Sequence, residues 1–356
     1  MGELAHAYRR MIDVRPSNVV SWTFFILLWP LSLLYFAVTR VRAALYGSGL
    51  LPAYRAGVPV VAVGNLTLGG TGKTPVTDAL VKRLLAHGLR VAVVSRGYGG
   101  RFTGEVGCVS RGDGQLGMTP EDAGDEPCLL AERNPLLNVY VARKRALGVQ
   151  AAERGGAQVI VLDDGFQHLA VHRDLDIVLL DSRAPFGNGQ LLPAGPLREA
   201  RSALRRADLV IMTHAGPSAP GIPFHGPVVH CRHRLADRLM TLDGREVAWS
   251  ELAGKSILAF AGIARPDDFF AALRGQGITL AATLALSDHQ DYSSEVLNRL
   301  NRLCDNNQLL ITTEKDAVKL RSVGLPCPCL VASLTLEFDE ASRLDDLLNR
   351  LLEEVK

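Results

Sequence analysis

The stretch Gly69-Gly70-Thr71-Gly72-Lys73-Thr74 decides the fold expected for this chain. An apolar run at 58–63 precedes it and an amphipathic run at 76–85 follows it, which predicts a strand, a glycine-rich loop and a helix. Glycines let a loop turn its N–H groups onto phosphate oxygens, and a helix N-terminus adds partial positive charge. The stretch therefore predicts a nucleoside triphosphate site, with Lys73 reaching the β- and γ-phosphates and the Thr74 hydroxyl on Mg²⁺.

One position departs from the full pattern G-x-x-x-x-G-K-[ST], because Thr67 stands where the pattern has glycine. The alternative interpretation is a glycine-rich turn with an incidental lysine, but the order of strand, loop and helix favours a phosphate site. A GTPase would carry its guanine-reading [NT]-K-x-D motif after the strand at 209–212. This chain has Thr213-His214-Ala215-Gly216 there, so ATP is expected rather than GTP.

Composition sets broad limits on the function. The 356 residues suggest about two domains, and the net charge of +2 provides no global field that favours nucleic acid. The six cysteines form no C-x-x-C pair, which fits a reducing cytosol better than a disulfide framework. We expect no nucleic-acid partner, and nothing in the sequence indicates an obligate protein partner.

The chain after the N-terminal region alternates apolar runs with helical patterns, which predicts a mostly parallel sheet covered by helices on both faces. Strands are expected at 58–63, 90–95, 138–142, 159–162, 177–181 and 209–212, with helices beginning near Lys73, Glu126, Lys144 and Arg198. A second set follows, with strands at 257–260, 279–284, 309–312 and 330–332 and helices at 266–274, 294–304 and 340–354. The predicted organisation is an N-terminal segment at 1–46, a P-loop domain at 47–215, a linker at 216–227 and a smaller α/β domain at 228–356.

An uncharged apolar run, VVSWTFFILLWPLSLLYFAV at 19–38, marks the N-terminal segment. As a helix it is about 30 Å long, the thickness of a bilayer core. A signal peptide, a buried core helix and a membrane anchor are the competing interpretations. The anchor is favoured, because the run is long for a signal peptide and no clear cleavage site follows. Pro30 would bend the helix and favours a bent or shallow insertion, and whether the helix spans the bilayer or lies in one leaflet stays open.

Two adjacent acidic residues follow one of the predicted strands. Asp163 and Asp164 end an apolar strand, where a P-loop enzyme needs an acid to hold Mg²⁺, although an Asp-Asp-Gly turn is the plain alternative.

Three other stretches carry charged residues with two possible interpretations each. Asp125 precedes a helical pattern, so the residues alone favour a helix cap over a general base. His289 lies in a polar loop and is either structural or functional, and the stretch Thr312-Thr313-Glu314-Lys315-Asp316 either binds substrate or forms a solvated ion cluster.

Together these motifs resemble the tetraacyldisaccharide 4′-kinase family of the lipid A pathway. LDDGFQH joined to this P-loop is the most specific part of the resemblance, which covers nearly the whole chain. The matching stretches are GNLTLGGTGKTP (64–75), SRGYGG (95–100), GDEP (124–127), LDDGFQH (162–168), LLPAGPLRE (191–199), AGIARPDDFF (261–270), DHQDY (288–292) and TTEKDAVKL (312–320).

The resemblance implies phosphorylation by ATP-Mg²⁺ of the 4′-hydroxyl of a tetraacyldisaccharide 1-phosphate, giving lipid IVA. It also implies an enzyme held at the cytoplasmic face of the bacterial inner membrane, with its lipid substrate in the bilayer. Asp125 matches the family's general base and His289 its assisting histidine, which reverses the preference for a cap. Lys73, Thr74, Asp163 and Asp164 match residues that serve the phosphates and the metal. Lesser candidates for substrate or phosphate contacts are Arg96, Tyr98, Glu126, Arg145 (or Arg143 in its place), His168 and Arg198.

Two other classes of function stay open from the sequence. A membrane-anchored P-loop ATPase that switches or partitions would hydrolyse ATP without a lipid acceptor, but Leu68 stands where partitioning ATPases have a signature lysine. A non-catalytic nucleotide-binding scaffold is the third class. The intact set of Lys73, Thr74 and Asp163 argues against it.

Overall fold

The computed structural model describes residues 8, 11–12, 18–216, 221–304, 308–321 and 323–353, which form two compact units. Unit 1 consists of Met1–Arg96, Lys144–Arg232 and Phe338–Lys356, and unit 2 of Gly97–Arg143 and His233–Glu337, as far as these ranges are described. This division differs from the predicted domain boundaries. Residues 97–143 belong to unit 2. The last helix belongs to unit 1, because the chain passes from unit 2 back to unit 1 at the end of β13.

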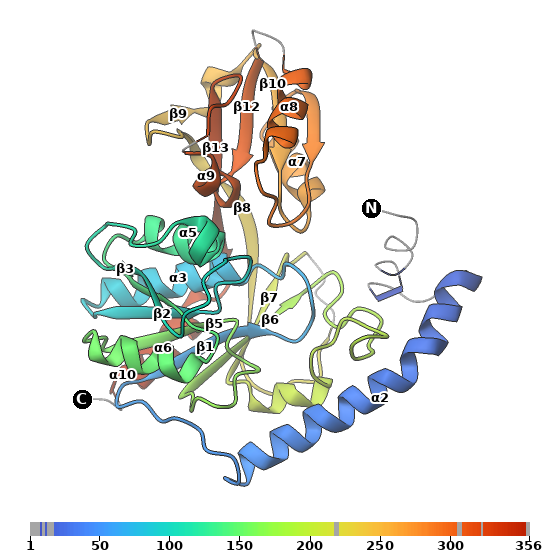
Figure 1. Ribbon diagram of the computed structural model, residues 1–356, viewed down its shortest axis with the longest axis vertical. Coiled ribbons are helices and arrows are strands. Elements are labelled where there is room, and N and C mark those ends of the chain that lie inside the picture. The colour runs from blue at the N-terminus through green and yellow to red at the C-terminus, as the bar shows by residue number, and fades with distance from the viewer. Residues whose placement is uncertain are drawn as a thin grey trace. The chain divides into compact units, whose positions relative to one another are not determined.

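A parallel sheet forms the centre of unit 1, with strand order β8-β7-β6-β1-β5-β2 (Figure 1). Its strands are buried along their length, which is why they read as continuous apolar runs. The helix α3 packs on β1, β5 and β2, and α6 packs on β2 and β5. The strands are β1 (Val60–Asn65), β2 (Val91–Ser95), β5 (Val159–Asp163), β6 (Leu175–Asp181), β7 (Leu209–Thr213) and β8 (Val228–Thr241). The helices are α2 (Val19–Gly47), α3 (Lys73–Ala86), α6 (Arg145–Arg154), η1 (Arg201–Arg206) and α10 (Ala341–Glu353).

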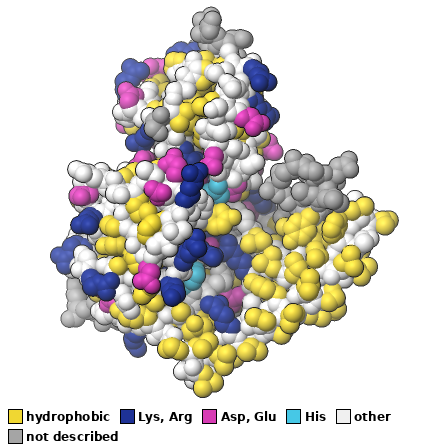
Figure 2. Space-filling model, viewed as in Figure 1, with side chains coloured by type: hydrophobic (Ala, Val, Ile, Leu, Met, Phe, Trp, Pro, Cys, Tyr) yellow, Lys and Arg dark blue, Asp and Glu magenta, His cyan; other side chains and the backbone are white. Residues whose placement is uncertain are grey.

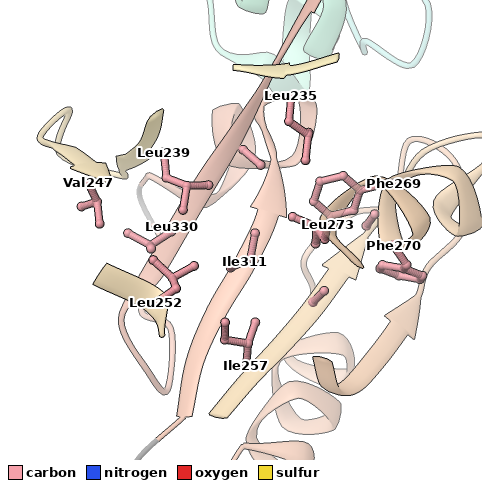
Figure 3. Close-up of a cluster of buried hydrophobic side chains, with 13 residues drawn as sticks. Leu235, Leu239, Val247, Leu252, Ile257, Phe269, Phe270, Leu273, Ile311 and Leu330 are labelled. Atoms are coloured by element: carbon pink, nitrogen blue, oxygen red, sulfur yellow. The ribbon is translucent and has the colours of Figure 1, made fainter. Parts of the chain in front are cut away.

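Unit 2 contains a second parallel sheet in the order β11-β10-β12-β13, and an antiparallel pair of β3 and β4. Side chains of β10, β12, β13, α7 and the second half of β8 form a buried apolar cluster that includes Ile257, Phe270 and Ile311 (Figure 3). The strands are β3 (Gly107–Arg111), β4 (Asn138–Val141), β9 (Glu246–Ala248), β10 (Ser256–Ala261), β11 (Leu280–Ala285), β12 (Gln308–Thr313) and β13 (Cys329–Phe338). The helices are α4 (Pro120–Ala123), α5 (Asp125–Arg133), η2 (Trp249–Leu252), α7 (Pro266–Gly275), α8 (Ser294–Leu303) and α9 (Glu314–Leu320).

The predicted fold class is confirmed: a mostly parallel sheet flanked by helices, a second smaller α/β unit and an N-terminal apolar helix. The helix predicted to begin near Arg198 is wrong. Arg198 donates its backbone N–H to Leu66 O and Leu197 bridges to Thr67, so this segment is extended and only a 3₁₀ helix follows. The short α4 and α9 and the strands β3, β8 and β9 were not predicted, because none has a long enough periodic pattern.

Candidate functional site

The phosphate loop joins β1 to α3 in unit 1. Gly69 and Gly72 have φ values of 107° and 80°, a left-handed backbone that favours glycine. The buried Thr71 hydroxyl accepts a hydrogen bond from Asn65 Nδ2 at 2.8 Å, which ties the loop to the end of the strand. Thr67 forms a β-bridge with Leu197, an extended arrangement that needs no glycine. The departure from the full pattern therefore falls where the backbone places no special demand.

The two adjacent carboxylates after β5 point to different partners. Asp163 is 2% exposed, and its two oxygens accept hydrogen bonds from the hydroxyls of Thr77 and Ser95 at 3.2 and 3.3 Å. Asp164 has a φ of 53° and its side chain is 33% exposed. Its oxygens lie 2.7 and 2.9 Å from Arg198 Nη1, and one lies 3.7 Å from Lys73 Nζ. Asp164 is therefore the carboxylate that faces the phosphate loop.

Cations surround these two carboxylates. Burial raises the pKa of Asp164, but the charges of Lys73, Arg198 and Arg145 outweigh it and lower the pKa below its usual value. Arg145 is buried, donates to Asp163 O at 3.3 Å and has a pKa lowered by burial to about 10, so it remains charged. Arg143 is exposed and lies in unit 2, which favours Arg145 of the two candidates.

Two further predicted residues lie in this part of unit 1. Arg96 is exposed just beyond β2, and its charge lowers the pKa of both Arg145 and His168. Burial and then Arg145 lower the pKa of His168 to about 4, so His168 is neutral at pH 7. Among the described residues no three His, Cys, Asp or Glu side chains gather as a metal cluster. The Thr74 hydroxyl and the Asp164 carboxylate still fit Mg²⁺, which takes one or two protein oxygens plus phosphate and water.

A second group of ionisable side chains lies within unit 2, centred on Asp125. Asp125 is 3% exposed, and its Oδ1 and Oδ2 lie 2.9 and 3.1 Å from His289 Nδ1. The helix cap is Gly124, with a φ of 91°, and Asp125 is the first residue of α5. The capping role that the residues alone favoured is therefore wrong, because the Asp125 side chain is turned to His289.

The lysines of α9 complete this group. Lys315 Nζ lies 3.9 Å from Asp125 Oδ2, and Lys319 Nζ lies 3.4 Å from the same oxygen. Burial raises the pKa of Asp125, but the hydrogen bond from His289 and the two ammonium charges lower it to about 2. Asp125 is thus ionised at neutral pH although it is buried. Asp125 and His289 both line a cavity of ≈ 40 Å³.

Two other predicted residues border the pair. Tyr98 is 68% exposed, and its ring meets the His289 ring edge to face with centroids 5.1 Å apart. Glu126 Oε1 lies 3.3 Å from Lys315 Nζ.

One buried carboxylate, Asp316, connects three motifs that are far apart or separate in the sequence. Asp316 is fully buried and accepts hydrogen bonds from Tyr292 Oη at 2.7 Å, from Thr313 Oγ1 at 2.7 Å and from Gly262 N at 3.0 Å. Asp316 therefore connects the AGI loop, the DHQDY loop and the start of α9.

The sequence analysis did not identify Lys319 as a functional candidate. Its i, i+4 spacing from Lys315 on a helix is the signal that could have identified it.

The helix α2 carries a large exposed apolar surface, visible as a continuous hydrophobic patch in Figure 2. Only 11% of its most apolar window is buried, so the interpretation as a buried core helix is wrong. One narrow stripe contacts the rest of unit 1. Ser32 Oγ donates to Leu191 O and accepts from Ala194 N, Tyr35 Oη donates to Arg198 O, and Arg42 donates to Gln167 O. The arginines 9, 10 and 15 before α2 lie outside the described residues.

Comparisons with known proteins find relatives over nearly the whole chain. A model of the family "Tetraacyldisaccharide-1-P 4'-kinase" matches residues 24–353. A tetraacyldisaccharide 4′-kinase of Syntrophotalea carbinolica is 48% identical over 356 residues, covering 99% of each chain. One of Geobacter metallireducens is 47% identical over 303 residues, covering 83% of this chain and 89% of its own. Among solved structures, the "apo" form of LpxK from Aquifex aeolicus in complex with ATP has a TM-score of 0.79 and 31% identity, covering 92% of this chain and 99% of that one.

Proposed function

This chain belongs to the tetraacyldisaccharide-1-P 4′-kinase family, and we propose that it transfers the γ-phosphate of ATP to the 4′-hydroxyl of a tetraacyldisaccharide 1-phosphate, giving lipid IVA. Membership makes the protein a kinase of lipid A biosynthesis, and the comparisons do not favour a switch or partitioning ATPase. The observation that carries the specific reaction is the buried, ionised Asp125 bound to His289. A sugar hydroxyl is a weak nucleophile until its proton has such an acceptor.

The proposed transfer is a single displacement at phosphorus. The 4′ oxygen forms a bond to the γ-phosphorus while the bond from that phosphorus to the β–γ bridging oxygen breaks, and ADP leaves. The hydroxyl proton moves to the Asp125 carboxylate, which His289 orients through its Nδ1 contact. An aspartate takes the same proton in protein kinases, where positioning and charge stabilisation supply most of the rate.

Residues of unit 1 serve the triphosphate in this proposal. The N–H groups of Gly69, Gly70, Thr71 and Gly72 cradle phosphate oxygens, and Lys73 reaches the β- and γ-phosphates. Arg145 and Arg198 stabilise the negative charge that spreads over the transferring group.

The residues fit Mg²⁺, with Thr74 and Asp164 as its protein ligands. Asp163 instead connects the start of α3 to the end of β2, through hydrogen bonds from Thr77 and Ser95. When bound, the ion neutralises charge on the phosphates. Arg96, Tyr98, Glu126 and the neutral His168 remain candidates for contacts to the sugar or its phosphate.

We assign α2 to the cytoplasmic surface of the bacterial inner membrane, lying in one leaflet rather than crossing it. Ser32 stands in the middle of the apolar run and is held to unit 1 by two hydrogen bonds. Ser21, Ser32, Tyr35 and Arg42 fall on one side of the helix by the 3.6-residue period, and the apolar side chains on the rest of the surface are exposed. This arrangement keeps the enzyme beside an acceptor whose acyl chains remain in the bilayer.

Replacing two leucines on the exposed surface of α2, Leu27→Ser with Leu34→Ser, should weaken binding to phospholipid vesicles about 100-fold or more. Leu27 and Leu34 are 67% and 63% exposed, and burying a leucine in lipid is worth about 1.5–3 kcal/mol. Vesicle flotation measures the binding, and circular dichroism checks that the fold is kept. Ser32→Ala is the matched control, which should lower the Tm but leave flotation unchanged. A double variant that unfolds instead of dissociating would contradict the assignment.

Radiolabelled ATP and purified disaccharide 1-phosphate in detergent micelles test the reaction itself. We expect label to appear in the lipid product, with little ATP hydrolysis when the acceptor is omitted. A folded protein that binds ATP but transfers no label would refute the proposal. ATP hydrolysis without acceptor, together with nucleotide-dependent dimerisation, would favour the switch ATPase instead.

A further inference from the structure

Lys315 lies beside three acidic side chains and His289. Its Nζ lies 3.1 Å from Asp288 Oδ1, 3.3 Å from Glu126 Oε1, 3.9 Å from Asp125 Oδ2 and 3.3 Å from His289 Nε2. The side chain is only 17% exposed. Burial lowers the pKa of Lys315, but Glu126, Asp125 and Asp288 raise it above the usual value, so the side chain is an ammonium. A buried ammonium with this set of contacts is not a solvated surface charge.

Lys319 lies one helical turn further along α9. Its Nζ donates to Gln290 O at 2.8 Å and lies 3.4 Å from Asp125 Oδ2, and the side chain is 11% exposed. The backbone contact joins the loop that carries His289 to α9. Lys319 therefore holds both the Asp125 carboxylate and the residue next to His289.

The contact of Lys315 with His289 favours one form of the imidazole ring. An ammonium has three donors and no acceptor, so a hydrogen bond from Lys315 forms only where His289 Nε2 carries no proton. In that form Nδ1 carries the proton and donates to Asp125, and the hydrogen bond to Asp125 is the main cause that raises the pKa of His289. His289 also has a φ of 56°, so its position depends on the loop contacts that Lys319 and Asp316 provide.

We propose that Lys315 and Lys319 are positioning residues for the phosphoryl transfer, holding Asp125 ionised and His289 in its Nδ1–H form. This inference rests on the proposed function, since it needs Asp125 to be the proton acceptor. Two fixed ammonium groups keep the buried Asp125 carboxylate ionised before the substrate hydroxyl arrives. The charged groups around the carboxylate then need not rearrange during the reaction. The groups around Asp125 and Lys315 that titrate or carry charge are Tyr98, Arg101, Glu121, Glu126, Cys128, Asp288, His289, Asp291, Lys315 and Lys319.

Lys315→Met should lower kcat about 10- to 100-fold with the KM for ATP changed less than about threefold, because misplacing a reacting group costs rate rather than nucleotide affinity. Loss of an ammonium also raises the pKa of Asp125, so the acidic limb of the pH–rate profile should move upward by about one unit or more. Lys319→Met should likewise lower kcat and move the acidic limb upward, with little change in the KM for ATP. Lys315→Arg, which restores the charge, should recover part of kcat, and Lys255→Met on the exposed surface of the same unit should match wild type.

An activity-independent readout separates this inference from the proposed function. In ¹⁵N-histidine-labelled protein, the His289 signals are assigned by their loss in His289→Gln. The hydrogen bond to Asp125 raises the pKa of His289, whereas burial and the charge of Lys315 lower it, so the His289 titration midpoint should rise further in Lys315→Met. A wild type that transfers no phosphate defeats the proposed function even if this shift is seen. If the wild type is active but the lysine variants keep the wild-type kcat and the wild-type His289 titration, the inference is overturned. A lysine variant whose only defect is a raised KM also overturns it.

Discussion

Asp125→Asn is expected to lower kcat about 10²- to 10⁴-fold, the usual contribution of a general base, with little change in ATP affinity. Asparagine fills the same space but cannot take the hydroxyl proton. The carboxylate is 3% exposed and lies in unit 2, whereas the phosphate loop belongs to unit 1, so the substitution leaves the residues of the loop unchanged. Initial-rate kinetics with ATP and lipid varied separately give kcat and each KM.

The pH dependence sharpens this expectation. The pKa of Asp125 is lowered to about 2, so the wild-type base is fully ionised across the neutral range and loses activity only as the pH falls toward that value. The residual activity of Asp125→Asn should lack this acidic limb. Asp237→Asn, an exposed aspartate in the same unit, is the control and should resemble wild type. An Asp125→Asn variant whose main defect is a raised KM for ATP would contradict the base assignment.

Lys73→Met is expected to lower kcat/KM for ATP by about 10³-fold and to weaken nucleotide binding measurably. Lys73 opens α3 directly after Gly72, and its ammonium lies 3.7 Å from Asp164 at the end of β5. In the proposed function, removing it takes away a charge that faces the transferring phosphate, and such groups contribute several orders of magnitude in phosphoryl transfer. Calorimetric titration with a non-hydrolysable ATP analogue measures binding apart from chemistry.

The two variants should therefore separate cleanly. Lys73→Met loses nucleotide affinity together with rate, and Asp125→Asn loses rate alone. Lys82 lies on the same helix, pairs with the buried Asp78 and has a side chain 49% exposed, so Lys82→Met should bind nucleotide like wild type. Equal nucleotide affinity in Lys73→Met and wild type would argue that the glycine loop does not hold the triphosphate.

Much of the fold was readable from local sequence. The runs that became β1, β2, β5 and β7 are buried on both faces, and such strands are apolar along their length. Strand β8 was missed because its burial is irregular over 14 residues, so neither a continuous apolar run nor a clear alternation marks it. The grouping of residues 97–143 with the second unit could not be predicted from the sequence either, because it depends on contacts between segments far apart in the chain.

The sequence by itself determined the phosphate loop, because the loop is contiguous and its glycines, lysine and threonine act through backbone geometry that neighbours dictate. Only the tertiary structure showed which groups surround Asp125, including the two lysines of α9. Asp125 and His289 are 164 residues apart, and the residues alone favoured a helix cap for Asp125, although the family resemblance indicated a general base. The physical reason is that the charge state of a buried group is set by what surrounds it in space, and not by its neighbours in the chain.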